Sequence, residues 1–247
     1  MRNLFHPTFE MDKIEVPTCA EHAQENIDRL TQTSRRSFFA KGLGAAAVGG
    51  TLAAASSAGA QGRSPLPSLY PGSTRRYFQQ LQFDEASHVN INAAAIRSLG
   101  GTVRPFPTFT GITNLTASQL LQTSVTIANT GVRAIFGAAP YISNPAVLGV
   151  SGSILAVEGY HAGFLNSISG LPLVPNGLTY DTALTIEQAT AIISPFIVSL
   201  NDNGQFPATF STTTKSNAND IAILNFAIII DFLEASLYFN NVPRLFG

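Results

Sequence analysis

Phe83-Asp84-Glu85-Ala86-Ser87-His88 is the most informative stretch of this chain, and Val157-Glu158-Gly159-Tyr160-His161 repeats its pattern. Each stretch holds a glutamate that is followed three residues later by a histidine. Positions i and i+3 of a helix lie on the same face about one turn apart, so the carboxylate and the imidazole of each pair can reach one point. The two stretches therefore predict two helices that each present an acid–histidine pair.

Apolar residues recur at helical spacing around both pairs, which places the pairs on core-facing stripes. The first stripe is Tyr77, Leu81, Glu85, His88, Asn92, Ala95 and Leu99, and the second is Val147, Ile154, Glu158, His161, Leu165 and Ile168. Because an ionised carboxylate is costly to bury alone, such groups are normally paired or bound to metal. Two pairs on facing helices supply half the ligands of a di-iron or di-manganese site in a four-helix bundle. Core Glu–His hydrogen bonds are the simpler alternative.

The segment from Asp220 to Tyr238 is the most apolar part of the chain. We expect it to be a buried helix rather than a membrane span, because the uninterrupted run is short and Asp231 and Glu234 would lie inside the membrane. Asp231 is a fifth candidate metal ligand, with Tyr238 two turns further along the same face. The alternative is a plain core helix with two satisfied acids.

The N-terminal part has the pattern of an export signal. Ser34-Arg35-Arg36-Ser37-Phe38-Phe39 precedes a weakly apolar Gly/Ala-rich run, and Ala58-Gly59-Ala60 provides a small-x-small cleavage site. The paired arginines indicate a twin-arginine (Tat) signal peptide over residues 1–60 and a periplasmic or secreted location. An ordinary secretory signal that happens to contain Arg-Arg is the alternative.

Removal of residues 1–60 leaves one domain, with residues 61–73 as a proline-bearing linker and residues 74–247 as the folded part. Cys19 is the only cysteine, so the mature chain would form no disulfide. Of the four histidines only His88 and His161 remain, and both belong to the two pairs. Because charge is scarce and balanced, we expect no binding to nucleic acid.

Turn and capping signals divide the folded part into helices. Gly100-Gly101 and Gly170 are stop signals, Thr116 is an N-cap, and Thr185 with Gln188 has the spacing of a capping box. The expected helices are 74–99, 116–139, 145–169, 185–193 and 220–238, with a surface loop over 201–219. This pattern predicts an all-α fold, a four-helix bundle.

The chain resembles the ferritin-like superfamily, and more narrowly the bacterial and fungal ferritin-like domain proteins called desiccation-related. The matching segments are Asp84-Glu85-x-x-His88-Val89, Gly131 to Pro140, Ile154 to His161, and Ile223-Leu224-Asn225-Phe226-Ala227 through Glu234-Ala235. The resemblance implies a ferritin-like bundle with an Fe or Mn centre. Its ligands would be Glu85, His88, Glu158, His161 and Asp231.

Two departures from the family pattern matter. The Leu-Asn-Phe-Ala segment usually begins the first bundle helix and here comes last, which implies a circularly permuted order; a truncated second domain copy is the alternative. The helix over 116–139 contains no Asp or Glu, and Ala128 stands where the resemblance expects its carboxylate. Asp231 is shorter than the usual Glu, and we expect Glu234 to compensate only if the last helix rotates. A mononuclear or empty site is therefore an option.

Two functions follow from these observations. The first is an exported metal-binding protein that acts in oxidative or desiccation stress. The second is a non-catalytic structural or stress-protection bundle that has lost its metal site. The two Glu–His pairs favour the first and Ala128 favours the second, so catalysis is left open.

Overall fold

The structure is a computed structural model that describes residues 66–69, 72–206 and 209–247. The described residues belong to one compact unit, Gly62–Gly247. The expected signal peptide over residues 1–60 lies outside the described residues, so its prediction stays untested.

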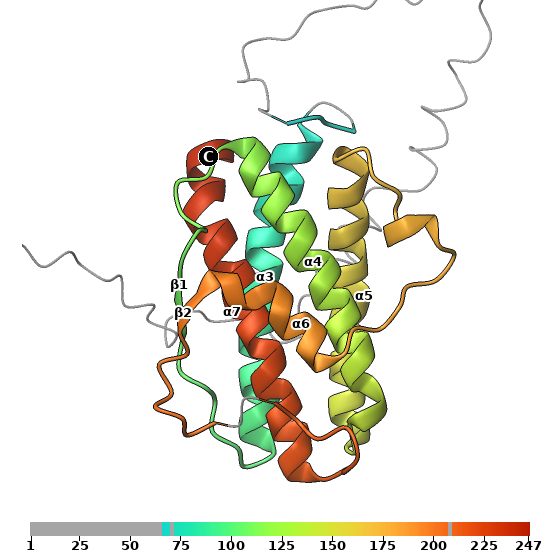
Figure 1. Cartoon of the computed structure of the whole chain (residues 1–247). Coiled ribbons are helices and arrows are strands. Elements are labelled where there is room, and N and C mark those ends of the chain that lie inside the picture. Colours follow the sequence, from blue (N-terminus) through green and yellow to red (C-terminus); the bar gives the residue numbers. More distant parts are fainter. Residues whose placement is uncertain (1–65, 70–71, 207–208) are drawn as a thin grey trace, which may run out of the picture. The chain divides into compact units, whose positions relative to one another are not determined.

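Four long helices make up this unit: α3 (Ser73–Ser98), α4 (Ala117–Ala138), α5 (Pro145–Ile168) and α7 (Asn217–Phe246) (Figure 1). α3 packs mainly against α7 and α4 mainly against α5, while α4 also packs against α7. The apolar stripes of the four helices meet in one core between these pairs. The predicted all-α helical bundle is therefore confirmed.

Local capping signals explain where the helices begin. The Thr116 hydroxyl accepts a hydrogen bond from the Gln119 backbone N–H, and the Gln119 side chain accepts one from Thr116 in return. Thr185 and Gln188 form the same reciprocal box at the start of α6 (Ile186–Ile193), as the sequence predicted. Pro145 occupies the first turn of α5, where its missing N–H costs nothing.

Shorter elements cover one side of the bundle. α6 packs across the outer side of α4 (Figure 1). Two short strands, β1 (Thr108–Phe109) and β2 (Ile197–Ser199), pair antiparallel. The 3-10 turns are η2 (Ala139–Tyr141), η3 (Pro175–Gly177) and η4 (Ser194–Phe196). The sequence did not predict the strands, because two or three residues are too few to show an alternating pattern.

α7 is longer than the sequence predicted. It begins at Asn217, where the Ser216 side chain accepts a hydrogen bond from the Asn219 N–H, and it continues through Pro243 to Phe246. Tertiary contacts hold the extra turns: the Asn241 amide donates to the Ile112 carbonyl, and Phe246 stacks on Phe78. Such contacts between distant segments leave no local signal.

α7 is long and apolar enough to cross a membrane by length and composition alone. In the structure 72% of its most apolar window is buried against the rest of the bundle. Asp220, in its first turn, accepts hydrogen bonds from the backbone N–H of Ser143 and of Asn144. These bonds tie the start of α7 to the start of α5.

Candidate metal centre

The two Glu–His pairs meet inside the bundle. α3 contributes Glu85 and His88, and α5 contributes Glu158 and His161. All four side chains are buried, with exposed fractions between 0% and 7%. The inward-facing stripes predicted from the sequence are thus confirmed, and two acids and two imidazoles share a small volume.

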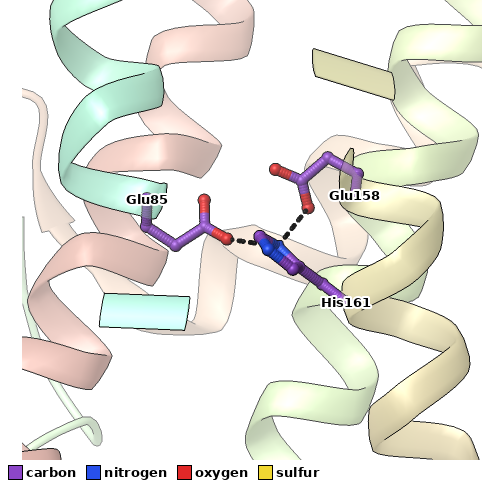
Figure 2. Close-up of side chains that lie close together, drawn as sticks. All are labelled: Glu85, Glu158 and His161. Carbon is purple, nitrogen blue, oxygen red and sulfur yellow. Dashed lines mark ion pairs between the residues drawn. The ribbon is translucent and has the colours of Figure 1, made fainter. Parts of the chain in front are cut away.

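His161 approaches both glutamates through the same ring nitrogen. Its Nδ1 atom lies 2.8 Å from Oε1 of Glu85 and 3.7 Å from Oε2 of Glu158 (Figure 2). Ligand atoms of these three residues all lie within 4.8 Å of one another. A single cation placed among them could therefore contact all three side chains.

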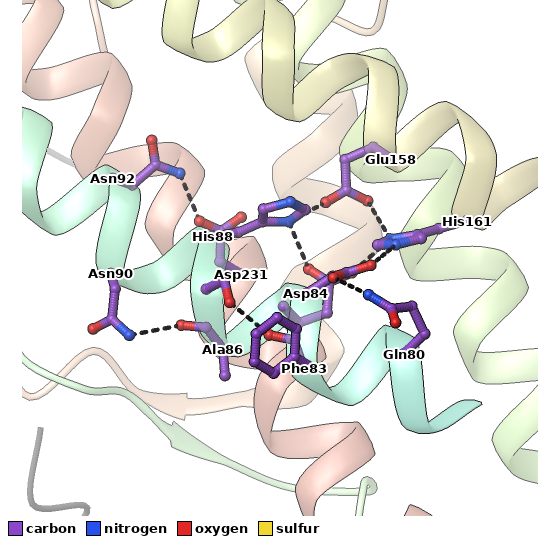
Figure 3. Close-up of polar contacts among 12 residues, drawn as sticks. Gln80, Phe83, Asp84, Ala86, His88, Asn90, Asn92, Glu158, His161 and Asp231 are labelled. Carbon is purple, nitrogen blue, oxygen red and sulfur yellow. Dashed lines mark hydrogen bonds and ion pairs between the residues drawn. The ribbon is translucent and has the colours of Figure 1, made fainter. Parts of the chain in front are cut away.

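His88 approaches the same two carboxylates from its own helix. Its Nδ1 atom lies 3.2 Å from Oε2 of Glu85 and 2.9 Å from Oε1 of Glu158 (Figure 3). The two imidazole ring centroids are 6.0 Å apart. Each carboxylate therefore offers one oxygen to His88 and the other oxygen to His161.

Asp84 holds the far side of the His161 ring. Its Oδ2 atom lies 3.1 Å from Nε2 of His161, and its Oδ1 accepts a hydrogen bond from the Gln80 amide at 2.6 Å. A carboxylate beside Nε2 favours a proton there, so when the ring is neutral the Nδ1 lone pair faces the glutamates. The Glu–His spacing does not predict Asp84 as a site residue, although it stands next to Glu85 in the sequence.

Electrostatics favour charged imidazoles in the absence of a bound cation. Burial lowers the pKa of both histidines, but the surrounding carboxylates outweigh it. Glu158 and Glu85 raise the pKa of His88 to about 11, and Asp84, Glu158 and Glu85 raise that of His161 to about 12. Burial raises the pKa of Glu158, yet the neighbouring His161 and His88 imidazoles lower it overall. The metal-free cluster is therefore held by ion pairs.

Several atoms of the cluster are buried without a hydrogen bond. They are Oε1 of Glu85, Nδ1 of His161 and both carboxylate oxygens of Glu158 and of Glu234. The close contacts of Glu158 and of His161 Nδ1 described above do not have hydrogen-bond geometry. Buried polar atoms are normally hydrogen-bonded, so a converging set of carboxylate oxygens and an imidazole nitrogen that lack hydrogen bonds fits a metal ion.

The family model of the ferritin-like domain matches residues 33–171. The chain belongs to the ferritin-like domain family. The match includes α3, α4 and α5 and thus both Glu–His pairs, and it ends before α7. No curated protein and no solved structure matches the chain.

Asp231, the predicted fifth ligand of this ferritin-like bundle, is buried on α7 with an exposed fraction of 3%. Its Oδ2 atom accepts a hydrogen bond of 2.6 Å from the Asn92 amide (Figure 3). Burial, and to a lesser extent the other acids, raises the pKa of Asp231 to about 7. Asp231 does not belong to the close group of Glu85, Glu158 and His161.

Glu234 is also buried on α7, with an exposed fraction of 1%. A Cβ atom built on Gly131 of α4 would lie 3.7 Å from Oε2 of Glu234 and 3.7 Å from Oε2 of Glu158. Asp231 and Glu234 therefore both lie inside the ferritin-like bundle. α4 offers only small side chains here, including the buried Ala128.

Proposed function

We propose that this chain is a metal-binding member of the ferritin-like family that holds Fe or Mn between α3 and α5. Glu85, His88, Glu158 and His161 are the proposed ligands, and Asp231 is a fifth candidate. The observation that carries the proposal is the pairing of each glutamate with both imidazoles, at 2.8–3.7 Å. Hard carboxylate oxygens combined with imidazole nitrogens suit these two metals.

Bound Fe or Mn would supply redox chemistry with O₂ or peroxide. The chain's own residues define the setting for it. Asp84 orients the His161 ring, and the buried carboxylates provide negative charge that compensates a divalent cation. A role in oxidative or desiccation stress belongs to this proposal and is supported by the sequence resemblance to desiccation-related proteins.

A second function is favoured by a separate observation. α4 contains no Asp or Glu, and the buried Ala128 stands where the family resemblance expects a carboxylate. A bundle that lacks this ligand would serve as a structural or stress-protection protein, with the Glu–His pairs acting as buried ion pairs. The two functions differ in whether the purified protein contains metal.

Elemental mass spectrometry on protein purified without chelators separates the two functions. The Glu85→Gln/Glu158→Gln double variant is the matched control, because it keeps the side-chain shapes and removes the negative charge. Near-stoichiometric Fe or Mn that is lost in the double variant would support the metal centre. Metal far below stoichiometry in the wild type, with a double variant that folds equally well, would support the structural bundle.

We also propose that residues 1–60 are a Tat signal that exports the chain to the periplasm or beyond. The Arg35-Arg36 pair followed by Phe38-Phe39 supports this proposal. An Arg35→Lys/Arg36→Lys variant should remain in the cytoplasm in fractionation experiments. Export of that variant at the wild-type level would indicate an ordinary secretory signal instead.

We further propose that α7 is the family's first helix, moved to the C-terminus. The family match ends at residue 171, and α7 nevertheless packs against both α3 and α4 as the fourth bundle helix. A rearranged chain with residues 217–246 placed ahead of α3 should fold with the same metal content. Failure of that chain to fold would contradict the proposed permutation.

A further inference from the structure

The outer face of α5 is uncovered within the described residues and carries no charge. α5 stands at one edge of the bundle and packs mainly against α4 (Figure 1). Its only acidic or basic side chains, Glu158 and His161, are buried. By contrast, α3 presents the exposed Arg75 and Arg97, and α7 presents the exposed Arg244. α5 is therefore unlike the helices beside it in having an exposed face that is entirely uncharged.

This face differs from the outer face of an ordinary surface helix. Such a helix normally turns charged or polar residues to water, and a helix that is apolar on all sides is normally buried. Tyr160 has an exposed fraction of 76%, and no large apolar side chain of the described residues is more exposed. Leu148, at the border of the same face, is 44% exposed. The composition of α5 therefore predicts a partner on its outer side.

Small residues form a line along this face. Gly149, Gly152, Ala156, Gly159 and Gly163 recur at spacings of three and four residues, which places them on one side of the helix. A Cβ atom on any of the four glycines would meet no atom within 4 Å, so packing inside the described chain does not require glycine there. Each glycine lowers helix stability compared with alanine. A second backbone that packs closely against this line would explain them.

The face is complementary to itself about Ala156. Tyr160 lies one turn from Ala156 toward the C-terminus, and Gly152 and Ser153 lie one turn from it toward the N-terminus. A two-fold axis at Ala156 would set two α5 helices antiparallel, which also opposes their dipoles. The Tyr160 ring of each copy would then meet Gly152 and Ser153 of the other copy. The protruding ring would thus lie where the opposite surface is flattest.

We propose that the outer face of α5 is the contact surface between two copies of this chain, which form a two-fold symmetric dimer. A second copy fits because a two-fold contact brings the same patch of both copies together, and an uncharged patch does so without repulsion. Glu158 and His161 lie on the opposite side of α5 from this face. The contact therefore requires no metal, and the dimer would persist if the proposed metal centre proved empty.

The size of the face predicts a weak dimer. α5 has 24 residues and is therefore about 36 Å long. With a width of about 10 Å, it offers roughly 400 Å² per copy. Leu171 and Leu173, which are 49% and 66% exposed, extend the apolar surface beyond the end of α5. Interfaces below about 1,200 Å² in total belong to weak complexes, so we expect a Kd on the order of 10 μM.

Sedimentation equilibrium of the full chain over a concentration series tests the proposal. The mass should rise from monomer to dimer, with a Kd that differs little between low and high salt because no charges take part. Ala156→Glu places two carboxylates together at the two-fold axis and should weaken the dimer by about tenfold or more. Ala94→Glu adds the same charge to an exposed position of α3 and should leave Kd unchanged.

A second variant guards against a folding defect. Circular dichroism verifies that Ala156→Glu is folded. Tyr160→Ser removes the protruding ring without adding a charge, and it should also weaken the dimer by about tenfold, because large aromatic side chains contribute most to such contacts. Tyr160→Ser replaces Ala156→Glu if that variant does not fold.

Disulfide cross-linking tests the antiparallel arrangement. Cys19, the only native cysteine, is first replaced by serine. Gly149 and Gly163 lie at equal distances on either side of Ala156, so the antiparallel dimer sets Gly149 of each copy opposite Gly163 of the other. A mixture of Gly149→Cys and Gly163→Cys chains should form disulfide-linked dimers, whereas neither variant alone should.

Three results would overturn the proposal: a wild type that stays monomeric at every concentration, equal weakening by Ala156→Glu and Ala94→Glu, or cross-linking of each cysteine variant with itself only. Sedimentation with phosphatidylcholine vesicles tests a different occupant. A monomeric wild type that binds these vesicles, and loses this binding in Ala156→Glu, would assign the face to a membrane surface and not to a second copy. Elemental analysis for metal is independent of all these results, so the metal centre and the dimer can fail separately.

Discussion

Asp84 on α3 holds the outer nitrogen of His161 on α5, with Oδ2 3.1 Å from Nε2. This contact presents the inner nitrogen of the same ring to Glu85 and Glu158. We predict that Asp84→Ala lowers the affinity for Mn²⁺ by about 10- to 100-fold, because loss of such an orienting carboxylate typically has this effect. Competition with a chelating dye measures the affinity.

Two further variants separate orientation from a general loss of charge. Asp84→Asn keeps an oxygen that can accept the Nε2 proton, and it should restore part of the affinity. Glu187→Ala removes an exposed acid on α6 and should have no effect on it. An unchanged affinity in Asp84→Ala would show that Asp84 does not position His161.

The raised pKa values of the two imidazoles predict how the free energy of unfolding depends on pH. Against the ordinary value of 6.5, the carboxylates raise the pKa of His88 to about 11 and that of His161 to about 12 despite burial. Because these pKa values are raised in the folded state, the stabilisation is fully present below pH 6.5 and is lost as pH rises toward 11. The free energy of unfolding should fall by about 1.4 kcal/mol per pH unit for each imidazolium.

Denaturant titrations of chelator-treated protein between pH 6.5 and pH 9 measure this slope. The His88→Gln/His161→Gln double variant should show little of it. Metal-loaded protein should show the reverse trend, since metal binding requires the imidazoles to lose their protons and so strengthens as pH rises. A metal-free wild type that gains stability over this range would contradict the ion-paired cluster.

The predictable part of the site is the part set by local geometry. Residues at positions i and i+3 of a helix share one face. The sequence therefore predicts that Glu85 lies beside His88 and Glu158 beside His161, on the inward faces of their helices. The role of Asp84 depends on His161, which lies on another helix. No pattern within α3 shows that contact.

The α7 helix shows why the remaining acids could not be placed. A helix that is apolar on nearly all sides gives no helical phase, so only the family resemblance favoured Asp231 over Glu234 as the acid that faces the cluster. In the structure both are buried, Asp231 with Asn92 as its partner and Glu234 with none for its carboxylate. The short β1–β2 pair was not predicted either, because it forms only where two segments far apart in the sequence pack together.

Two glycines on α4 should respond in opposite ways to replacement by alanine. At Gly131 a new Cβ would have no atom closer than 3.7 Å, whereas at Gly137 it would overlap the Leu184 carbonyl oxygen. Gly131→Ala should stabilise the fold by about 0.5–1 kcal/mol through better helix propensity. Gly137→Ala should destabilise it by about 1–3 kcal/mol, because the segment before α6 must move.

Urea denaturation of both variants measures these changes, with each acting as the control for the other. Leu184 donates its N–H to the Arg133 carbonyl of α4 at 3.0 Å, and that bond fixes the close approach at Gly137. Equal effects of the two substitutions would show that Leu184 does not pack on α4 as described.

Glu234 allows the metal-binding and the structural functions to be distinguished by stability alone. Both of its carboxylate oxygens are buried without a hydrogen-bond partner, and burial together with Glu85, Glu158 and Asp231 raises its pKa well above the ordinary value. A buried, unpaired polar group costs about 1–3 kcal/mol. We therefore predict that Glu234→Met stabilises the chelator-treated protein by about that amount.

The same substitution should reduce metal binding if Glu234 contributes its charge to the centre. Thermal unfolding with and without Mn²⁺ tests both effects, and Glu234→Gln serves as the control because it keeps the shape and the polarity. If Glu234→Met is more stable than the wild type without metal but is stabilised less by Mn²⁺, then Glu234 destabilises the metal-free bundle and contributes to metal binding. A destabilised Glu234→Met protein would instead assign Glu234 to the packing of the core.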